Sequence, residues 1–362
     1  MFRLAGPVKH LVGLGKYFAR LQRFCSKTSK VPTDKTSRKK FQVSIIGGTS
    51  QTAQSLSLLL KEHLLINRLM LYDLPKSTCG LGIDLSHIPS QTLVEGKGGY
   101  IGSALRDSDI VVLACSEPRK TGQTDYDLYR ANANRIVQSV KEICKHCPKA
   151  FIVNLTEPIN YTVPLTSLVL HSSRCYDSSK VLGVTGTDGM KAQACLNLLY
   201  KIPPEQPVNV PVICGHSAKT AVPLLSHITP WFNVDACASI MITEIIRESE
   251  GRIVALKRGS GQSCCLTAYA GFKTVSAILS ALDGVPKKDI GFVANNDYDT
   301  KFFAAPVNIT KDGISDVAEY KFVGSIEAAY LKDAVKELRN EINEAETYYN
   351  EAINDKKPTQ MY

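Results

Sequence analysis

The chain has 362 residues, of which 44% are hydrophobic and 21% charged, and its formal net charge is +9. These values are typical of an ordinary globular protein that is long enough for two domains, or for one large two-lobed domain. Residues 1–40 hold 11 of the 43 Lys and Arg residues and one of the 34 acidic residues, Asp34. The remaining 32 basic and 33 acidic residues nearly balance, so composition predicts no nucleic-acid-binding surface.

The basic segment at residues 1–40 has the character of a targeting sequence. Apolar residues from Leu11 to Leu21 share one face of an expected helix, basic residues share the other face, and Ser and Thr residues follow. This pattern predicts a mitochondrial transit peptide, cleaved between Phe24 and Lys40, and hence a location in the mitochondrial matrix. The alternatives are a disordered basic arm, or a surface helix that binds anionic membrane.

The 11 cysteines do not predict a secreted disulfide framework, because they are scattered and odd in number in a long chain. We expect reduced thiols throughout, with Cys264 and Cys265 in the core. Cys144-Lys-His-Cys147 is a single C-x-x-C motif without a second pair, so it predicts no metal site. No apolar run reaches the roughly 18 residues that a membrane-spanning helix needs, and we expect no stable membrane insertion.

The folded part begins with the order of a dinucleotide-binding unit. Residues 41–46 are expected to form a buried strand, a turn follows at Gly47, and a helix begins near Gln54. A second strand at residues 68–72 ends at Asp73. In such a unit the terminal acid holds the adenosine ribose.

The glycine pattern of this unit is incomplete. Gly47 is present, but Ser50 stands where a second glycine is expected, and Ala53 stands where a third is expected. Alanine is tolerated at the third position, where the helix packs on the strand. Ser50 is expected to lengthen the approach of the backbone to a pyrophosphate.

The remaining elements predict the fold class. Strands at 109–114, 150–154 and 181–184, with a long helix at 126–147, indicate a parallel, doubly wound sheet. The second half is richer in helices, expected at 188–200, 236–256, 262–282 and 325–350, with antiparallel strands at 290–293 and 302–308. We therefore predict an α/β protein with an N-terminal Rossmann-type parallel-sheet domain at residues 41–182, a mixed α/β catalytic domain at 183–355 and a tail at 356–362.

Two segments of the second half could meet as a proton relay. Asp188 lies in Val184-Thr-Gly-Thr-Asp188, and His216 lies in Val212-Ile-Cys-Gly-His216. A carboxylate that touches an imidazole orients it and stabilises its charged form, and the imidazole then exchanges a proton with a substrate hydroxyl. The alternative is that Asp188 caps a helix and His216 lies in a turn after an apolar run.

The loop after the strand at 109–114 offers an anion-binding group. It contains Pro118-Arg119-Lys120, and loops at the carboxyl ends of parallel strands line the ligand crevice. Arg119 is therefore a candidate anion clamp. The alternative is a solvated basic turn.

Together these segments resemble the lactate/malate dehydrogenase family, in particular its mitochondrial-type malate dehydrogenase branch. The resemblance runs from Phe41 to about Asn350 and includes Leu71-Tyr-Asp73, Asp84-Leu-Ser-His-Ile88, Pro118-Arg-Lys120, Pro158-Ile-Asn160, Val208-Asn-Val-Pro-Val212, Gly215-His216 and Ala268-Tyr-Ala-Gly271. It implies a Rossmann domain followed by an α/β catalytic domain, a homodimer, NAD as cofactor and no metal. It further implies that malate and oxaloacetate are interconverted by hydride transfer.

The resemblance also implies individual roles. His216 would be the acid/base residue with Asp188 as its partner, Arg119 would grip the distal carboxylate of a dicarboxylate, and Asn160 would lie in the substrate site. The positions implied for cofactor binding are Gly47, Gly48, Ser50, Gln51, Ala53, Asp73, Ser116, Asn132, Thr156 and Thr267.

Four positions depart from the family's pattern. Asp125 replaces an arginine that polarises the ketone, Lys191 replaces an arginine that holds the reacting-end carboxylate, Glu157 replaces an asparagine, and Ser116 replaces a glycine. Asp125 and Glu157 put negative charge where a dianion must bind, and Lys191 lacks the planar fork of arginine. Besides a malate dehydrogenase of reduced activity, two functions stay open: a catalytically degenerate paralogue with a structural or interaction role, and a dehydrogenase of another 2-hydroxy acid.

Overall fold

The computed structural model describes residues 40–354, apart from residues 75–76, 204 and 297. The predicted transit peptide lies outside the described residues except for Lys40, and so does the predicted tail. The residues from Lys40 onward belong to one unit. The domain boundary predicted near residue 182 therefore stays a prediction.

The N-terminal half is a parallel sheet, as the alternation of elements predicted. Its strand order is β3-β2-β1-β4-β5-β6, and every neighbouring pair is parallel. The connections change direction between β1 and β4, so the carboxyl ends of these two strands border the crevice in which such sheets bind ligands. The strands are β1 (Phe41–Ile46), β2 (Ile66–Tyr72), β3 (Leu93–Lys97), β4 (Ile110–Leu113), β5 (Phe151–Asn154) and β6 (Val181–Val184).

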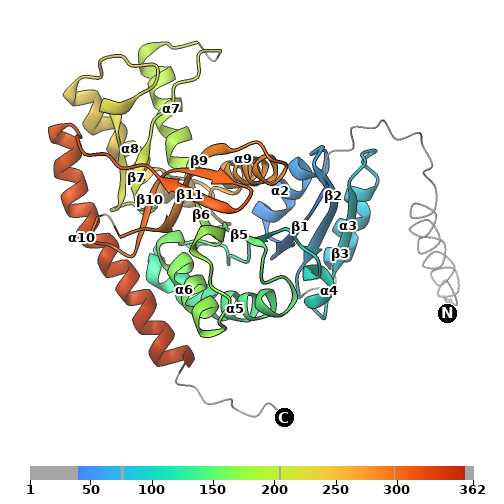
Figure 1. The fold of residues 1–362 in the computed structure, drawn as a ribbon. Coiled ribbons are helices and arrows are strands. Elements are labelled where there is room, and N and C mark those ends of the chain that lie inside the picture. Colours follow the sequence, from blue (N-terminus) through green and yellow to red (C-terminus); the bar gives the residue numbers. More distant parts are fainter. Residues whose placement is uncertain (1–39, 75–76, 204, 297, 355–362) are drawn as a thin grey trace, which may run out of the picture. The chain divides into compact units, whose positions relative to one another are not determined.

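Helices cover both faces of this sheet (Figure 1). Because side chains alternate along a strand, each strand feeds two cores. Ile45 and Val112 belong to the core under α2 and α9, whereas Ile46 and Val111 belong to the core under α5 and α6. The helices of this half are α2 (Gln51–Lys61), α3 (Ser77–Ser86), α4 (Gly102–Leu105), α5 (Asp125–His146) and α6 (Ile159–Ser172), with α9 (Cys264–Leu282) contributed by the second half.

The second half extends the sheet with antiparallel strands, which confirms the predicted pairing. β6 pairs with β9, and the order continues β9-β10-β7-β8, with β11 also paired to β10. A third apolar core joins α7 and α8 to β7 and β8. The remaining elements are η1 (Ser178–Lys180), α7 (Gly186–Tyr200), β7 (Val212–Cys214), β8 (Ala221–Pro223), η2 (Leu225–His227), α8 (Ala236–Leu256), β9 (Lys287–Ala294), β10 (Phe302–Thr310), β11 (Gly313–Val317), α10 (Ser325–Tyr348) and η3 (Tyr349–Asn354).

Most predicted elements begin and end within a few residues of the observed ones. The start of α2 differs, and several elements were not predicted: α3, α4, α6, β3, β7, β8 and β11. α2 begins at Gln51 and not near Gln54, because the Ser50 side chain accepts a hydrogen bond from the Ala53 amide and caps the helix. α6 was not predicted at all. Nearly all of its residues are buried and Pro164 lies inside it, so it has no single apolar face that a helical period could reveal.

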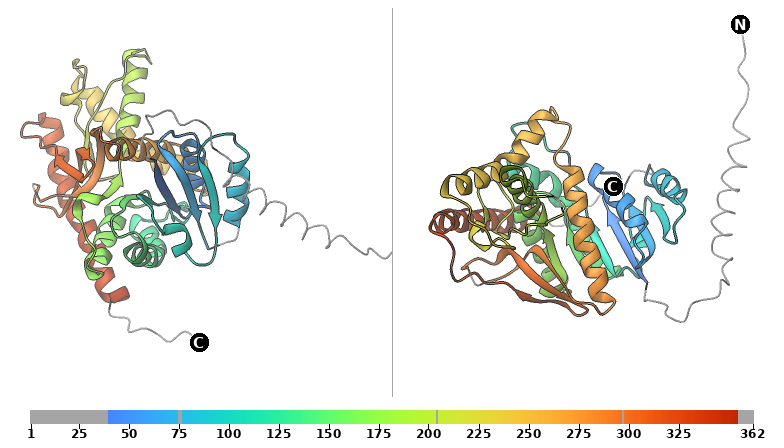
Figure 2. Two further views of the ribbon diagram at one scale, coloured as in Figure 1. Left: turned by 45° about the vertical axis from the view of Figure 1, so that its right-hand side comes forward. Right: turned by 90° about the horizontal axis from the view of Figure 1, so that it is seen from above.

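α9 is apolar over a longer stretch than the search for uninterrupted apolar runs indicated. In length and composition this helix could cross a membrane, although half of it is buried in the protein. A buried core helix meets the same criterion, and α9 packs along α2 on one face of the sheet, as the two views of Figure 2 show. The finding is therefore weak support for membrane insertion.

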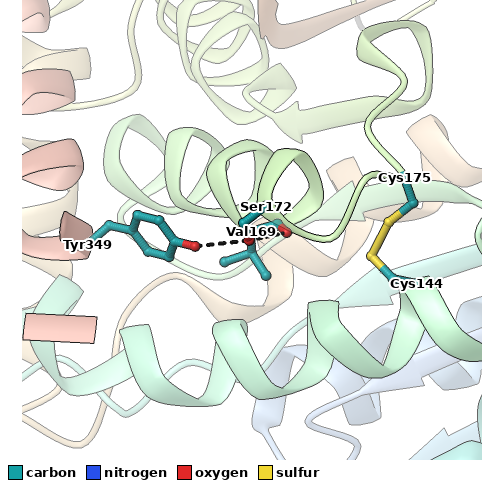
Figure 3. Close-up of a disulfide and its surroundings, with 5 residues drawn as sticks. All are labelled: Cys144, Val169, Ser172, Cys175 and Tyr349. Atoms are coloured by element: carbon teal, nitrogen blue, oxygen red, sulfur yellow. Dashed lines mark hydrogen bonds between the residues drawn. A yellow bond between two sulfur atoms is a disulfide. The ribbon is translucent and has the colours of Figure 1, made fainter. Parts of the chain in front are cut away.

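The cysteines correct two further expectations. Cys144 in α5 and Cys175, just after α6, form a disulfide (Figure 3), so the prediction that every thiol is reduced was wrong. The packing of α5 on α6 brings together two cysteines that are 31 positions apart. Cys264 is only partly buried and Cys265 is exposed, because the buried face of α9 is formed by Thr267, Ala268 and their helical neighbours.

Removing this disulfide should destabilise the fold. A crosslink that closes a loop of this length stabilises a protein by about 2–4 kcal/mol, chiefly by restricting the unfolded chain. We expect the Cys144→Ser, Cys175→Ser protein to melt lower than the wild type without reductant, and the two to melt alike after full reduction. Equal melting temperatures under non-reducing conditions would show that the two thiols are unpaired.

Candidate active site

The turn after β1 is shaped for a glycine and for close approach of a ligand. Gly47 has a φ of 87°, and a Cβ atom there would lie 2.5 Å from the carbonyl oxygen of Ala114. The amides of Gly47 and Gly48 both donate to the carbonyl oxygen of Tyr72 at 2.9 Å. The end of β1 is thereby held against the ends of β2 and β4, with the amino end of α2 facing the crevice, where helices bind anions.

Ser50 was expected to lie where the backbone approaches a pyrophosphate, but its side chain makes hydrogen bonds within the protein. Its hydroxyl donates to the Ala114 carbonyl at 2.9 Å and accepts from the Ala53 amide at 3.1 Å. The side chain is therefore folded into the cap of α2 and braces the turn against β4.

Asp73 lies at the carboxyl end of β2, where the sequence placed it. Its Oδ2 accepts from the Thr49 amide at 3.1 Å and from the Thr49 hydroxyl, and its Oδ1 accepts from the Leu74 amide at 2.8 Å. Five of the predicted cofactor residues line one cavity of about 330 Å³ at this point: Gly47, Ser50, Gln51, Asp73 and Ser116.

The other predicted cofactor residues lie behind this cavity. Asn132 accepts from the Glu117 amide and donates to the Glu157 carbonyl, both at 2.8 Å, and so connects the two loops that follow β4 and β5. Thr156 accepts from the Cys115 amide at 3.2 Å. Gly48, Ala53 and Thr267 pack within the turn, α2 and α9 respectively. Sequence reasoning missed Thr49, Arg135 and Gln262, which also line the cavity.

Asp188 and His216 meet in the second cavity of about 330 Å³. The Nδ1 atom of His216 lies 2.5 Å from Oδ2 of Asp188. Asp188 is in the first turn of α7, and His216 follows β7. The side-chain oxygen of Asn160 accepts from the His216 backbone amide at 2.8 Å. The predicted proton-relay pair is thus brought together and fixed from two sides.

Glu157 faces the other ring nitrogen of His216. Its Oε1 lies 3.3 Å from Nε2, so the imidazole is placed between two carboxylates. Burial lowers the pKa of His216, but Asp188 and Glu157 outweigh it and raise that pKa to about 10. In turn, burial raises the pKa of Asp188, while His216 and Lys191 bring it down to about 2. The pair is therefore an imidazolium and a carboxylate at neutral pH.

Lys191 is also held by Asp188. Its Nζ lies 3.1 Å from Oδ1 of Asp188, one turn along α7. Burial lowers the pKa of Lys191, and the Asp188 carboxylate raises it above the ordinary lysine value. Lys191 therefore remains charged in the cavity, although part of its charge is neutralised.

Arg119 and Asp125 form an ion pair inside the same cavity. Asp125 is the first residue of α5, whose amino end is capped by Thr124 and Asp127. The sequence placed Asp125 opposite a bound dianion, but did not reveal that its carboxylate would take the guanidinium of Arg119. The predicted anion clamp is thus already paired with an acid at the start of the following helix.

Comparisons with known proteins agree with this arrangement. Residues 41–183 match the NAD-binding domain of lactate/malate dehydrogenases, and residues 185–348 match the α/β C-terminal domain of the same proteins. The chain belongs to the lactate/malate dehydrogenase family. It is 33% identical over 310 residues to mitochondrial malate dehydrogenase of Homo sapiens and of Bos taurus, covering 85% of this chain and 91% of each relative.

Solved structures show the same fold. Malate dehydrogenase of Cryptosporidium parvum superposes with a TM-score of 0.75 at 22% identity, covering 85% of this chain and 99% of that one. Lactate dehydrogenase of Eimeria maxima, solved with NADH and oxamate, gives a TM-score of 0.75 at 19% identity, covering 90% and 99%. Malate and lactate dehydrogenases are equally near in structure, so the shared fold does not fix the substrate of this chain.

NAD is the cofactor of this family, and the crevice fits it. The turn at Gly47 packs closely on the backbone of Ala114 and Cys115 and has no room for a side chain, the amino end of α2 follows it, and Asp73 presents a carboxylate after the end of β2. These are the features that receive a pyrophosphate and a ribose in Rossmann domains.

Gly47→Ala should weaken NADH binding strongly. The added methyl group would overlap Ala114 and force the turn away from a positive φ, which costs about 1–3 kcal/mol in strain alone. We expect at least a tenfold rise in the Kd of NADH, measured by fluorescence titration. Gly284→Ala is the matched control, because Gly284 has a φ of 94° with no atom within 4 Å of an added Cβ. Unchanged NADH affinity in Gly47→Ala would contradict the assignment of this turn.

Proposed function

We propose that this protein is an NAD-dependent oxidoreductase that interconverts a 2-hydroxy acid and its 2-oxo acid, and that it turns over malate and oxaloacetate with reduced efficiency. The observation that carries the proposal is the contact between His216 Nδ1 and Asp188 Oδ2, in a cavity beside the Rossmann crevice. Gln262 lines both cavities, which supports a reaction between ligands bound in the two.

His216 supplies the proton chemistry of this reaction. NAD, when bound, supplies the hydride acceptor for oxidation, and NADH supplies the hydride donor for reduction. For reduction, the His216 imidazolium donates its Nε2 proton to the substrate oxygen. For oxidation, neutral His216 accepts the hydroxyl proton. Asp188 holds the ring by Nδ1 and stabilises its charged form. Because the pKa of His216 is raised to about 10, the free protein favours reduction at neutral pH.

Two acids of the cavity oppose a dicarboxylate substrate. Asp125 forms an ion pair with Arg119, and Oε1 of Glu157 lies 3.3 Å from Nε2 of His216. A dianion must displace both carboxylates or bind beside them, and each repulsion at about 5 Å is on the order of 3 kcal/mol at an effective dielectric near 20. These contacts support reduced activity on malate. They equally favour the alternative of a 2-hydroxy acid whose far end carries no negative charge.

Turnover assays decide among these functions. The protein lacking residues 1–40 is supplied with NADH and oxaloacetate, beside a His216→Asn variant as control. We expect NADH to bind and oxaloacetate to be reduced slowly, with activity lost in His216→Asn. Turnover of hundreds per second, high in the usual enzyme range, would contradict the reduced efficiency. Binding of NADH without His216-dependent turnover of any 2-oxo acid would favour the degenerate paralogue.

We further propose a mitochondrial matrix location and a homodimer. The relatives named above are mitochondrial malate dehydrogenases, and residues 1–40 have the composition of a transit peptide. Leu58 and Leu64 in and after α2, with Tyr269 in the neighbouring α9, are large apolar side chains on the surface, which suits an interface with a second copy. A mature protein that begins at Met1 and is found in mitochondria-free fractions would contradict the proposed location. A monomeric mass by light scattering would contradict the proposed homodimer.

A further inference from the structure

The active-site cavity contains a basic side chain to which neither the sequence nor the family resemblance gave a role. Arg247, in α8, lines the same cavity as Arg119, Lys191 and His216. It comes from a helix of the second half of the chain, whereas Arg119 lies in the loop after β4.

The other charged side chains of this cavity are largely satisfied within the protein. Arg119 pairs with Asp125, Lys191 pairs with Asp188, and His216 lies between Asp188 and Glu157. Glu250, the remaining acid of the cavity, accepts hydrogen bonds from the Ser263 amide at 2.9 Å and from the Ser263 hydroxyl at 2.5 Å. The remaining lysine, Lys120, is exposed on the loop.

Arg247 is held in place but is not paired with an acid. Among the described residues, no carboxylate lies within the 4.0 Å of an ion pair with it, and Glu244 and Asp333 act on its charge only from farther away. Its Nε donates to the Ala221 carbonyl at 3.0 Å, and its guanidinium lies 4.6 Å from the centre of the Tyr330 ring.

One nitrogen of this guanidinium lacks an acceptor. Nη2 of Arg247 is buried and has no hydrogen-bond partner among the described residues. An unsatisfied charged donor is unfavourable, and a carboxylate is the acceptor whose geometry matches the guanidinium fork. Since arginine stays protonated in proteins, Arg247 is a charged group of the cavity lining without a paired carboxylate in the part of the chain that the structure describes.

We propose that Arg247 binds the carboxylate of the substrate, and that the substrate is a 2-oxo acid with a single carboxylate. This inference rests on the proposed function and specifies its substrate class. The unpaired guanidinium of Arg247 can neutralise one carboxylate of a substrate. A second carboxylate would be repelled by Asp125, which is paired with Arg119, and by Glu157, which lies beside His216. A neutral far end avoids both repulsions.

The test compares Arg247→Gln and Arg247→Lys with the wild type. The matched control is Arg252→Gln, an exposed arginine on the same helix that pairs with Glu248. Binding of oxamate is measured by calorimetry with and without saturating NADH, and kcat and KM are measured for 2-oxobutyrate and oxaloacetate. Melting temperature and NADH affinity report whether each variant is folded.

We expect oxamate to bind the wild type and Arg252→Gln alike, and to bind Arg247→Gln about 10- to 100-fold more weakly, as for loss of a charged hydrogen bond. NADH affinity should not change, and the effect on turnover should fall on KM. Arg247→Lys keeps the positive charge but not the planar guanidinium, so its oxamate affinity should lie between those of the wild type and Arg247→Gln. If Arg247→Gln does not fold, the oxamate affinity of Arg247→Lys tests the inference instead. 2-Oxobutyrate should exceed oxaloacetate in kcat/KM.

Three results would overturn the inference: no oxamate binding to the wild type, wild-type affinity in a folded Arg247 variant, or a preference for oxaloacetate. Failure of the proposed function has a different signature. In that case NADH does not bind, or turnover does not depend on His216, whatever the effect of Arg247 on oxamate.

Discussion

Asp125→Arg should raise kcat/KM for oxaloacetate by at least 10²-fold. The substitution releases Arg119 from its ion pair with Asp125. It also removes an electrostatic repulsion of about 3 kcal/mol between the Asp125 carboxylate and the dianionic substrate, and it supplies a hydrogen-bond donor to the developing oxyanion. Removing one such preorganised donor from an enzyme costs about 3–4 kcal/mol, or roughly 10²–10³ in rate. The measurement is steady-state NADH oxidation with oxaloacetate at neutral pH.

Two controls separate these contributions. Asp125→Asn frees Arg119 without adding a cation, and we expect a smaller gain from it. Asp312→Arg makes the same change of charge at an exposed turn between β10 and β11 and should leave kcat/KM unaltered. Because Asp125 lies in the first turn of α5, an arginine there should lower stability by about 0.3–1 kcal/mol through the helix dipole. If Asp125→Arg shows wild-type kcat/KM, Asp125 does not oppose the substrate.

Glu157→Gln should lower the pKa of His216 and speed oxidation at neutral pH. With a pKa of about 10, the neutral imidazole that oxidation requires is about one part in a thousand at pH 7. Glutamine keeps the shape of the side chain and removes one of the two flanking carboxylates. We expect malate oxidation at pH 7 to rise about 10- to 100-fold, and the ascending limb of its pH profile, which reports deprotonation of His216, to shift to lower pH. Glu248→Gln, at an exposed position of α8, is the control.

The same substitution should change the pH dependence of stability. The folded-state pKa of His216 lies above the unfolded value of about 6.5. Its contribution to stability is therefore complete below about pH 6.5 and is lost as pH rises through about 10. Denaturant unfolding of the wild type should show this loss, and Glu157→Gln should show less of it. Parallel curves for the two proteins would mean that Glu157 does not act on His216.

The sequence predicted the framework of the fold because its signals are local. The apolar strands ending at Asp73 and Val184, and the glycine at Gly47, each report a short-range requirement of backbone or packing. α6 was missed because nearly all of it is buried. The Cys144–Cys175 disulfide was missed because the two cysteines meet only through the packing of α5 on α6.

The contact of Asp188 with His216 was predicted, but the contacts of Arg119 with Asp125 and of Glu157 with His216 were not. The sequence and the resemblance placed Asp188, His216, Arg119 and Glu157 at one site, and the structure brings these side chains into one cavity. The ion pair between Arg119 and Asp125 depends on the path of the loop after β4. The spacing of residues in the sequence does not reveal that path. Arg247 was missed for a related reason: it comes from the middle of α8, where an arginine is usually a solvated surface residue.

The central claim is that one imidazole lies charged between two carboxylates in the active-site cavity. Its most direct test is an NMR titration of the His216 ring in the protein lacking residues 1–40, with His216→Asn used to assign the resonance. We expect a midpoint near pH 10, and a lower one in Glu157→Gln. A midpoint near 6.5 in the wild type, unmoved by Glu157→Gln, would contradict it.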